Sequence, residues 1–169
     1  MRVSYAIVTL SFLAALACGQ RASQSEPKAP VAPITITGDL QNIDVCRAVP
    51  REDIEAVMGR KLVAAPQHFE YYEEKGTSGC WYDAGKDASK EAHFGYVVFT
   101  PVEVYNSQPL YNNMPVNGIG VSAYFNNGAD ARQLWVKVSD KVAFVVAFAD
   151  VPNEQGAKAI AKLVLAAIK

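Results

Sequence analysis

The sequence has few of the residues on which catalytic and metal sites depend. It holds only two histidines, His68 and His93, and three cysteines. Neither histidine lies in a spacing such as H-E-x-x-H, and a structural zinc site needs four clustered thiolate or imidazole ligands. No nucleophile stands out either. We therefore expect no catalytic residue, no metal site and no cofactor.

The chain also lacks runs of charge and, beyond its first residues, long apolar runs. Sixteen Lys and Arg oppose seventeen Asp and Glu, for a net charge of −1. Without a basic block, a nucleic-acid partner is not expected. The longest later apolar run, Val142 to Ala149, has the length of a strand rather than of a membrane span.

The N-terminus has the three parts of a secretory signal in residues 1–17. Arg2 supplies the positive charge, an apolar run follows, and Ala15-Leu16-Ala17 places small residues near a cleavage point. With Cys18, these residues resemble the bacterial lipobox, although Leu16 stands one place late. This pattern predicts lipidation of Cys18, with palmitate-type chains among the acyl groups. An ordinary signal peptide cleaved nearby is the alternative.

Residues 18–43 are expected to form the anchor cysteine and a disordered linker. Residues 19–38 contain three prolines and no aromatic residue, so they cannot bury enough apolar surface to offset ordering. The predicted location is the cell envelope, with the membrane bound through the lipid and the domain facing the periplasm or exterior. Gly19, in place of Asp, favours the outer membrane in a Gram-negative host.

Use of Cys18 for lipid leaves Cys46 and Cys80 as a pair. In an oxidising compartment these two should form a disulfide. A metal-thiolate site is the alternative, and two thiols with two distant histidines do not support it.

The periodicity of the chain predicts one α+β domain over residues 44–169. A short helix is expected from Pro50 to Met58, ended by Gly59, and a second from about Pro152 to the C-terminus. Between them lie the strand-like segments 61–72, 79–84, 91–100, 120–125, 132–138 and 142–149. We expect an antiparallel sheet of about five or six strands packed against the two helices as a two-layer sandwich.

Several motifs in their order along the chain resemble a known family. These are DVCRAVPREDIEAVMGRKL, SGCWY, GIGVSAYF, RQLWVKVSDKVAFVV and a Lys/Ala-rich terminal helix. They are similar to a family of secreted, actinobacterial-type lipoproteins of unknown function and, more loosely, to the extracellular sensor domains of receptor kinases. The resemblance covers residues 44–169 and implies the Cys46–Cys80 bridge and a helix-backed antiparallel sheet. It carries no catalytic residues. The family often has an acidic residue where this chain has Val121 and Ser122.

Two glycine motifs suggest chemistry that their context does not support. Gly118-Ile119-Gly120-Val121-Ser122-Ala123 matches a dinucleotide fingerprint, which requires a helix after it, whereas a β segment is expected here. The overlapping start of a nucleophile elbow ends in Tyr124 rather than glycine. A glycine turn that enters a strand is the better interpretation.

The stretch from Tyr105 to Pro115 is the candidate binding loop. Tyrosine offers broad amphipathic contact and asparagine adaptable hydrogen bonds, as in antibody loops, and long connections are often functional. An inert surface loop is the alternative. The candidate binding residues are Tyr105, Tyr111, Asn112, Asn113 and Trp135. A pocket among them would favour a small ligand, and a flat aromatic patch would favour a protein partner.

The sequence thus predicts a membrane-anchored envelope lipoprotein that works as a non-enzymatic binding or scaffolding module. Its expected partner is an envelope protein or a small ligand. The alternatives are a sensor-like ligand-binding domain and, less favoured, an enzyme of unknown type.

Overall fold

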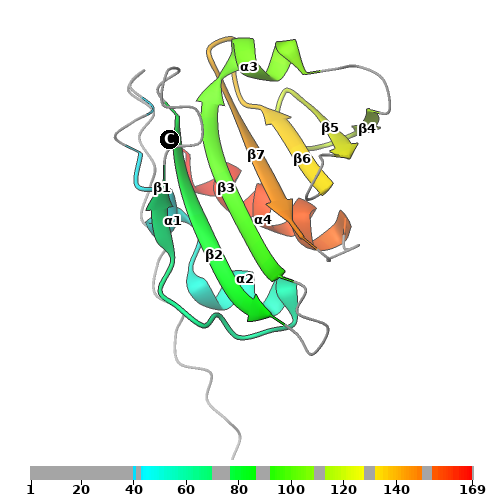
Figure 1. Cartoon of the computed structure of the whole chain (residues 1–169). Helices are drawn as coiled ribbons and strands as arrows, with labels where there is room; N and C mark the ends of the chain where they lie inside the picture. Colours follow the sequence, from blue (N-terminus) through cyan, green and yellow to red (C-terminus); the bar gives the residue numbers. More distant parts are fainter. Residues whose placement is uncertain are drawn as a thin grey trace, which may run out of the picture.

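The computed structural model describes residues 40, 43–69, 77–86, 92–108, 113–127, 132–149 and 154–168. These residues form one seven-stranded antiparallel sheet in the order β1-β2-β3-β7-β6-β5-β4. The strands are β1 (Gln67–Phe69), β2 (Ser78–Lys86), β3 (Ala92–Pro101), β4 (Met114–Val116), β5 (Ser122–Asn127), β6 (Arg132–Lys137) and β7 (Val142–Phe148). The helices are α1 (Val45–Ala48), α2 (Arg51–Met58), α3 (Val102–Ser107) and α4 (Glu154–Ala167). Figure 1 shows α2 and α4 behind the sheet and α3 at one end of its strands. The expected α+β class is confirmed.

The sheet consists of two meanders joined side by side. Strands β1, β2 and β3 form the first, and β4, β5, β6 and β7 form the second. They meet where β3 pairs with β7 over seven residues, from Gly95 opposite Phe148 to Pro101 opposite Val142. Helix α3 follows β3 directly and begins the connection to the second meander (Figure 1). Thus β3 and β7 are the central strands.

Helix α2 has the ends that its sequence predicts. Pro50 precedes its first residue, and Glu52 and Asp53 lie in its first turn, where carboxylates favour the helix dipole. Gly59 ends the helix in the left-handed conformation, with φ of 64°, and its N–H bonds to the carbonyl of Glu55. The buried Ile54 and Met58 attach this helix to the core.

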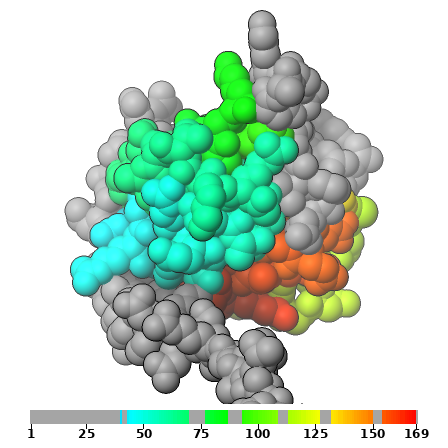
Figure 2. Space-filling model, turned by 90° about the horizontal axis from the view of Figure 1, so that it is seen from below, coloured from blue at the N-terminus to red at the C-terminus, as the bar shows by residue number. Residues whose placement is uncertain are grey.

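Helix α4 covers the same face of the sheet as α2. Its buried stripe contains Ala157, Ile160, Ala161 and Val164, at helical spacing. Opposite them lie large sheet residues such as Phe99, Leu134 and Phe144, all fully buried. Seen from below in Figure 2, the segment of α1 and α2 lies beside α4. No helix in the described ranges is long and apolar enough to cross a membrane.

The disulfide between Cys46 and Cys80 is present, as predicted. It joins α1 to β2, and the two Cα atoms lie 5.0 Å apart. Cys80 is fully buried among core residues. The bond therefore fixes the N-terminal helical segment to the helix-covered face of the sheet.

The structure differs from the sequence expectations in several elements. The sheet has seven strands rather than five or six, because the three-residue strand β4 lies at the end of the stretch expected to be a loop; β1 occupies only three residues of the segment expected over 61–72. Helix α3 occupies the start of the stretch expected to be a loop, and the short α1 was not predicted. Leu40 and Ile43, placed in the linker by the sequence, are buried in the core. The folded domain therefore includes residues on the N-terminal side of the expected boundary at residue 44.

The second face of the sheet, opposite α2 and α4, carries its own apolar cluster. Its buried members are Tyr96, Val98, Val104, Tyr124, Trp135, Val145 and Ala147. Helix α3 supplies Val104 and lies against β3, β6 and β7. Aromatic residues of β1, β2 and β3 extend this cluster beyond α3.

Candidate functional site

Three of the sequence-predicted site residues lie outside the described residues. These are the lipidation site Cys18 and the loop residues Tyr111 and Asn112. The described candidates are Tyr105, Asn113 and Trp135. The predicted long binding loop is wrong in part, because its ends belong to α3 and β4.

Tyr105 connects α3 to the second face of the sheet. Its ring packs on Tyr124 with centroids 4.9 Å apart, and its hydroxyl lies 3.0 Å from Ser122 Oγ. The Tyr124 hydroxyl donates to the Tyr105 carbonyl at 3.0 Å, and burial, with a smaller effect of Tyr105, raises the pKa of Tyr124. Tyr105 is half-buried and held at both its ring and its backbone, so its first role is to seat α3.

Trp135 lies on the second face, as its strand alternation predicts, but it is not a surface residue. It is 2% exposed, and its Nε1 donates to Gln133 Oε1 at 2.9 Å. Gln133 Nε2 in turn donates to the Tyr96 hydroxyl at 2.9 Å. Trp135 is thus a support for this face. Asn113 is half-buried, and its side-chain amide atoms have no hydrogen-bond partner among the residues that the structure describes.

The accessible aromatic surface of the second face lies on the first meander. We define the aromatic patch as Phe69, Trp81, Phe94 and Tyr96. Register places Trp81 opposite Tyr96, and Phe94 precedes Tyr96 by two residues on the same strand. The Trp81 ring is nearly parallel to both, at 4.5 Å from Phe94 and 6.1 Å from Tyr96, and Phe69 meets Trp81 edge-on at 6.1 Å. Three of these rings remain partly exposed, and only Tyr96 is buried.

The residues of the aromatic patch are not among the sequence-predicted binding residues. The alternation of side chains along β2 and β3 does indicate which residues share the second face. Trp81 stands between the core residues Cys80 and Tyr82, and Phe94 and Tyr96 alternate with small or buried positions. Which of these rings stays accessible depends on how far α3 reaches, and this cannot be deduced from alternation.

A serine and a histidine meet near the disulfide, but their hydrogen bonds oppose nucleophilic catalysis. Ser78 is fully buried, and its Oγ donates to the carbonyl of Ile43 at 2.7 Å. His68 Nε2, 2.8 Å from the same Oγ, must then act as the donor. A general base would have to accept the serine proton instead. This pair therefore fastens the N-terminal segment to β1 and β2.

The other residues considered for catalysis, nucleotide binding or metal binding have structural positions in the fold. His93 is buried in β3 at 5% exposure. Gly118 and Gly120 both have positive φ, and the strand β5 follows them, so this is a glycine turn entering a strand. Within the described ranges, no three His, Cys, Asp or Glu side chains come together as a metal site would require.

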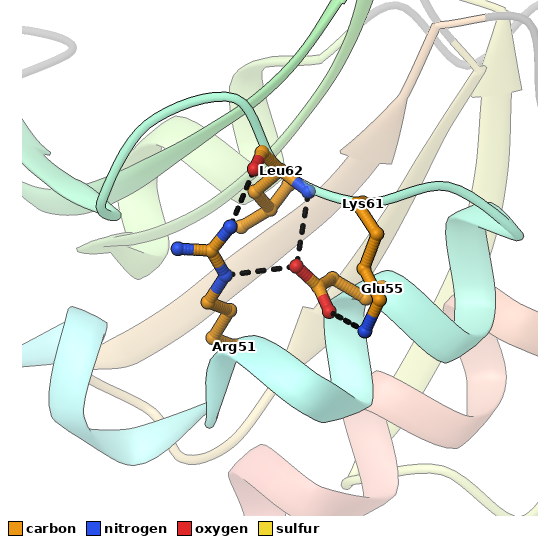
Figure 3. A network of polar contacts seen from close by, with 4 residues as sticks. All are labelled: Arg51, Glu55, Lys61 and Leu62. Carbon is orange, nitrogen blue, oxygen red and sulfur yellow. Dashed lines mark hydrogen bonds and ion pairs between the residues drawn. The ribbon is translucent and has the colours of Figure 1, made fainter.

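The carboxylate of Glu55 in α2 has three bonded partners. Figure 3 shows it between Lys61, whose Nζ is 2.6 Å from Oε2, and Arg51, whose Nε is 2.8 Å from Oε1. The N–H of Leu62 also donates to Oε1 at 3.0 Å, and Arg51 donates to the Leu62 carbonyl. With Glu55 only 7% exposed, this network ties α2 to the segment that leads to β1.

These contacts predict a pH-dependent stability. Lys61 first, then Arg51 and the Leu62 amide, lower the pKa of Glu55 from 4.5 to about 2. Because the folded pKa is depressed, the stabilisation is complete above pH 4.5 and is lost as the pH falls towards 2. Glu55→Gln should therefore lower the midpoint of thermal unfolding at pH 7, and the difference from the parent chain should shrink across this window. Glu52→Gln, at an exposed position of the same helix, is the matched control and should change little. A Glu55→Gln effect that persists unchanged at pH 2 would contradict the assignment.

Comparisons of the chain with protein-family models, curated proteins and solved structures found no match.

Proposed function

We propose that this chain is a lipid-anchored lipoprotein of the cell envelope whose domain is a non-enzymatic binding module. The anchor is Cys18, and the docking surface is the aromatic patch, which takes an uncharged, apolar surface of an envelope protein. The observation that carries the proposal is the group of partly exposed, mutually packed rings on the sheet face that α2 and α4 leave free.

The shape and chemistry of the patch favour a protein surface over a small molecule. Its residues come from three neighbouring strands, so the rings spread over the sheet. Aromatic residues are enriched at the centres of protein interfaces, and charged residues are depleted there. Asp83 is the charged residue beside Trp81 on this face of β2, and its Oδ1 already accepts from the Gly85 N–H at 2.7 Å. A partner would therefore contact mainly aromatic carbon.

The supporting structure beneath the patch is rigid, which lowers the entropy lost on binding. Tyr96 is held by Gln133, and Gln133 by Trp135, so a hydrogen-bonded chain runs from the patch across β7 to β6. Ala147, the register partner of both Tyr96 and Gln133, leaves room for this contact above β7. The absence of an activated nucleophile in the Ser78 and His68 pair supports binding over catalysis.

Site-specific photo-crosslinking of the full chain in its own host tests this proposal. A photo-reactive phenylalanine analogue at Phe94 should give one discrete adduct in the membrane fraction, and the same analogue at the exposed Lys141 should not. Trp81→Ala should lower the yield of the Phe94 adduct several-fold, and Trp81→Phe should restore most of it. Cys18→Ser should move the chain out of the membrane fraction.

Each part of the proposal has its own contradicting outcome. Equal adducts from positions 94 and 141, or a Phe94 adduct indifferent to Trp81→Ala in a chain that melts normally, would exclude the patch. A Cys18→Ser chain that stays in the membrane fraction would exclude the anchor.

A further inference from the structure

A groove runs along the exposed flank of α4, on the opposite side of the sheet from the aromatic patch. It is about 510 Å³ in volume, within the range of small-molecule sites. One wall is formed by Gln155, Lys158, Ala159 and Lys162, which recur along one side of the helix. The other is the segment 115–119, from β4 towards β5. Figure 2 shows the lime-coloured part of the chain that contains this segment alongside the orange helix.

The groove is positively charged although the chain as a whole is not. Two lysines line it and no carboxylate does. Glu154 is the nearest acidic residue in the sequence. Its Oε1 lies 2.7 Å from Arg132 Nη2, and its Oε2 lies 3.7 Å from Lys158 Nζ. Glu154 is therefore shared between Arg132 and Lys158, and this one carboxylate against the three cations Arg132, Lys158 and Lys162 leaves an excess of positive charge beside the groove. In a chain of net charge −1, this is a local concentration of positive charge.

The wall opposite the lysines combines polar groups with an apolar floor. Ile119 is 3% exposed and belongs to the core, and Val116 packs against the same core, so the floor is fixed and apolar. Asn117 and Gly118 are exposed at the rim. A Cβ atom placed at Gly118 would have no neighbouring atom within 4 Å, so the backbone at this residue is open to a ligand.

We propose that this groove binds a small organic anion, in which a phosphate or carboxylate contacts Lys158 and Lys162. The carbon atoms next to the charge lie on Ile119 and Val116, and the amides of Asn117 and Gln155 bond its remaining oxygens. This inference is independent of the proposed docking function, because the groove shares no residue with the aromatic patch. The anionic group belongs either to a free molecule or to the headgroup of a lipid.

The probe that carries this chemistry in its simplest form is glycerol 3-phosphate. The full chain, with Cys18→Ser in every sample, should show chemical-shift changes on titration at low salt that centre on residues 117–119 and on the lysine side of α4. Glycerol, which lacks the charge, should give none at these positions. Lys158→Gln/Lys162→Gln should weaken binding about tenfold, because two solvent-facing ion pairs are lost. The matched control is Lys86→Gln/Lys141→Gln, which removes the same charge from exposed positions outside the groove and should leave the affinity unchanged.

Vesicles distinguish the two sources of the anion. Binding to glycerol 3-phosphate without retention on phosphatidylglycerol vesicles supports a free molecule. Lysine-dependent retention on those vesicles, but not on phosphatidylcholine, supports a lipid headgroup. Equal weakening by both double variants, shifts that map away from residues 115–119, or no response to either probe would overturn the proposal.

Discussion

The Cys46→Ala/Cys80→Ala chain is expected to lose about 4 kcal/mol of the free energy of unfolding. The cysteines are 34 residues apart, and opening a loop of this size restores chain entropy mainly to the unfolded state. For a domain of this size the loss corresponds to a fall of about 15 °C in the midpoint of thermal unfolding. Calorimetry or denaturant titration followed by circular dichroism measures both quantities.

Two comparisons separate the covalent link from the loss of the side chains. Reduction of the parent chain opens the loop while both sulfur atoms stay in place, so it should reproduce most of the change. Cys18→Ala removes the remaining cysteine of the chain and should leave the midpoint where it was. A double variant as stable as the parent would mean that α1 is held on β2 by packing alone.

The second large loss of stability is expected when Gly120, in the turn that enters β5, is replaced by alanine. Its φ is 60°, and a Cβ there would lie 2.5 Å from the carbonyl oxygen of Lys137, a backbone atom of β6 that cannot move aside alone. The same carbonyl accepts the N–H of Val121 at 2.8 Å, so relief of the clash would break this bond as well. Gly120→Ala should therefore destabilise the fold by about 3 kcal/mol or more.

The neighbouring Gly118 provides the matched control for this clash. Its φ of 76° is as unfavourable for alanine, but no atom lies within 4 Å of the added carbon. Gly118→Ala should cost only about 1–2 kcal/mol, the strain of the left-handed conformation itself. Comparable losses in the two variants, measured by urea unfolding, would show that the contact with Lys137 does not matter.

The elements that the sequence predicts well are those in which local pattern and tertiary environment agree. In β6 the alternation of Leu134 and Val136 with Gln133 and Trp135 matches the two faces of the sheet. Helix α3 was missed because its sequence, VEVYNS, is poor in strong helix formers. It is kept in place by burial of Val102 and Val104 and by the bonds of Tyr105 and Tyr124. Strand β4 is too short for a period of two to stand out, and β1 fills only three residues of the segment expected over 61–72.

The candidate site was harder to predict than the fold. The tyrosines and Trp135 were selected for residue type, yet Tyr105 and Trp135 serve mainly to build the second face. The rings that remain accessible belong to β1, β2 and β3, whose contact with one another depends on strand register. The groove beside α4 depends on a helix and a turn that are about forty residues apart in the chain, so no local motif marks it.

The covalent link between α1 and β2 also determines how the domain responds to mechanical load. A pull on the chain ahead of Cys46 passes through the sulfur atoms to Cys80 in β2, and the residues between them cannot be drawn out. Cys80 lies within the β2–β3 ladder, so the load is passed to a strand that is hydrogen-bonded along its length to β3. Helix α2, the Glu55 network and β1 all lie inside the closed loop. They are therefore shielded from tension that arrives from the N-terminal side.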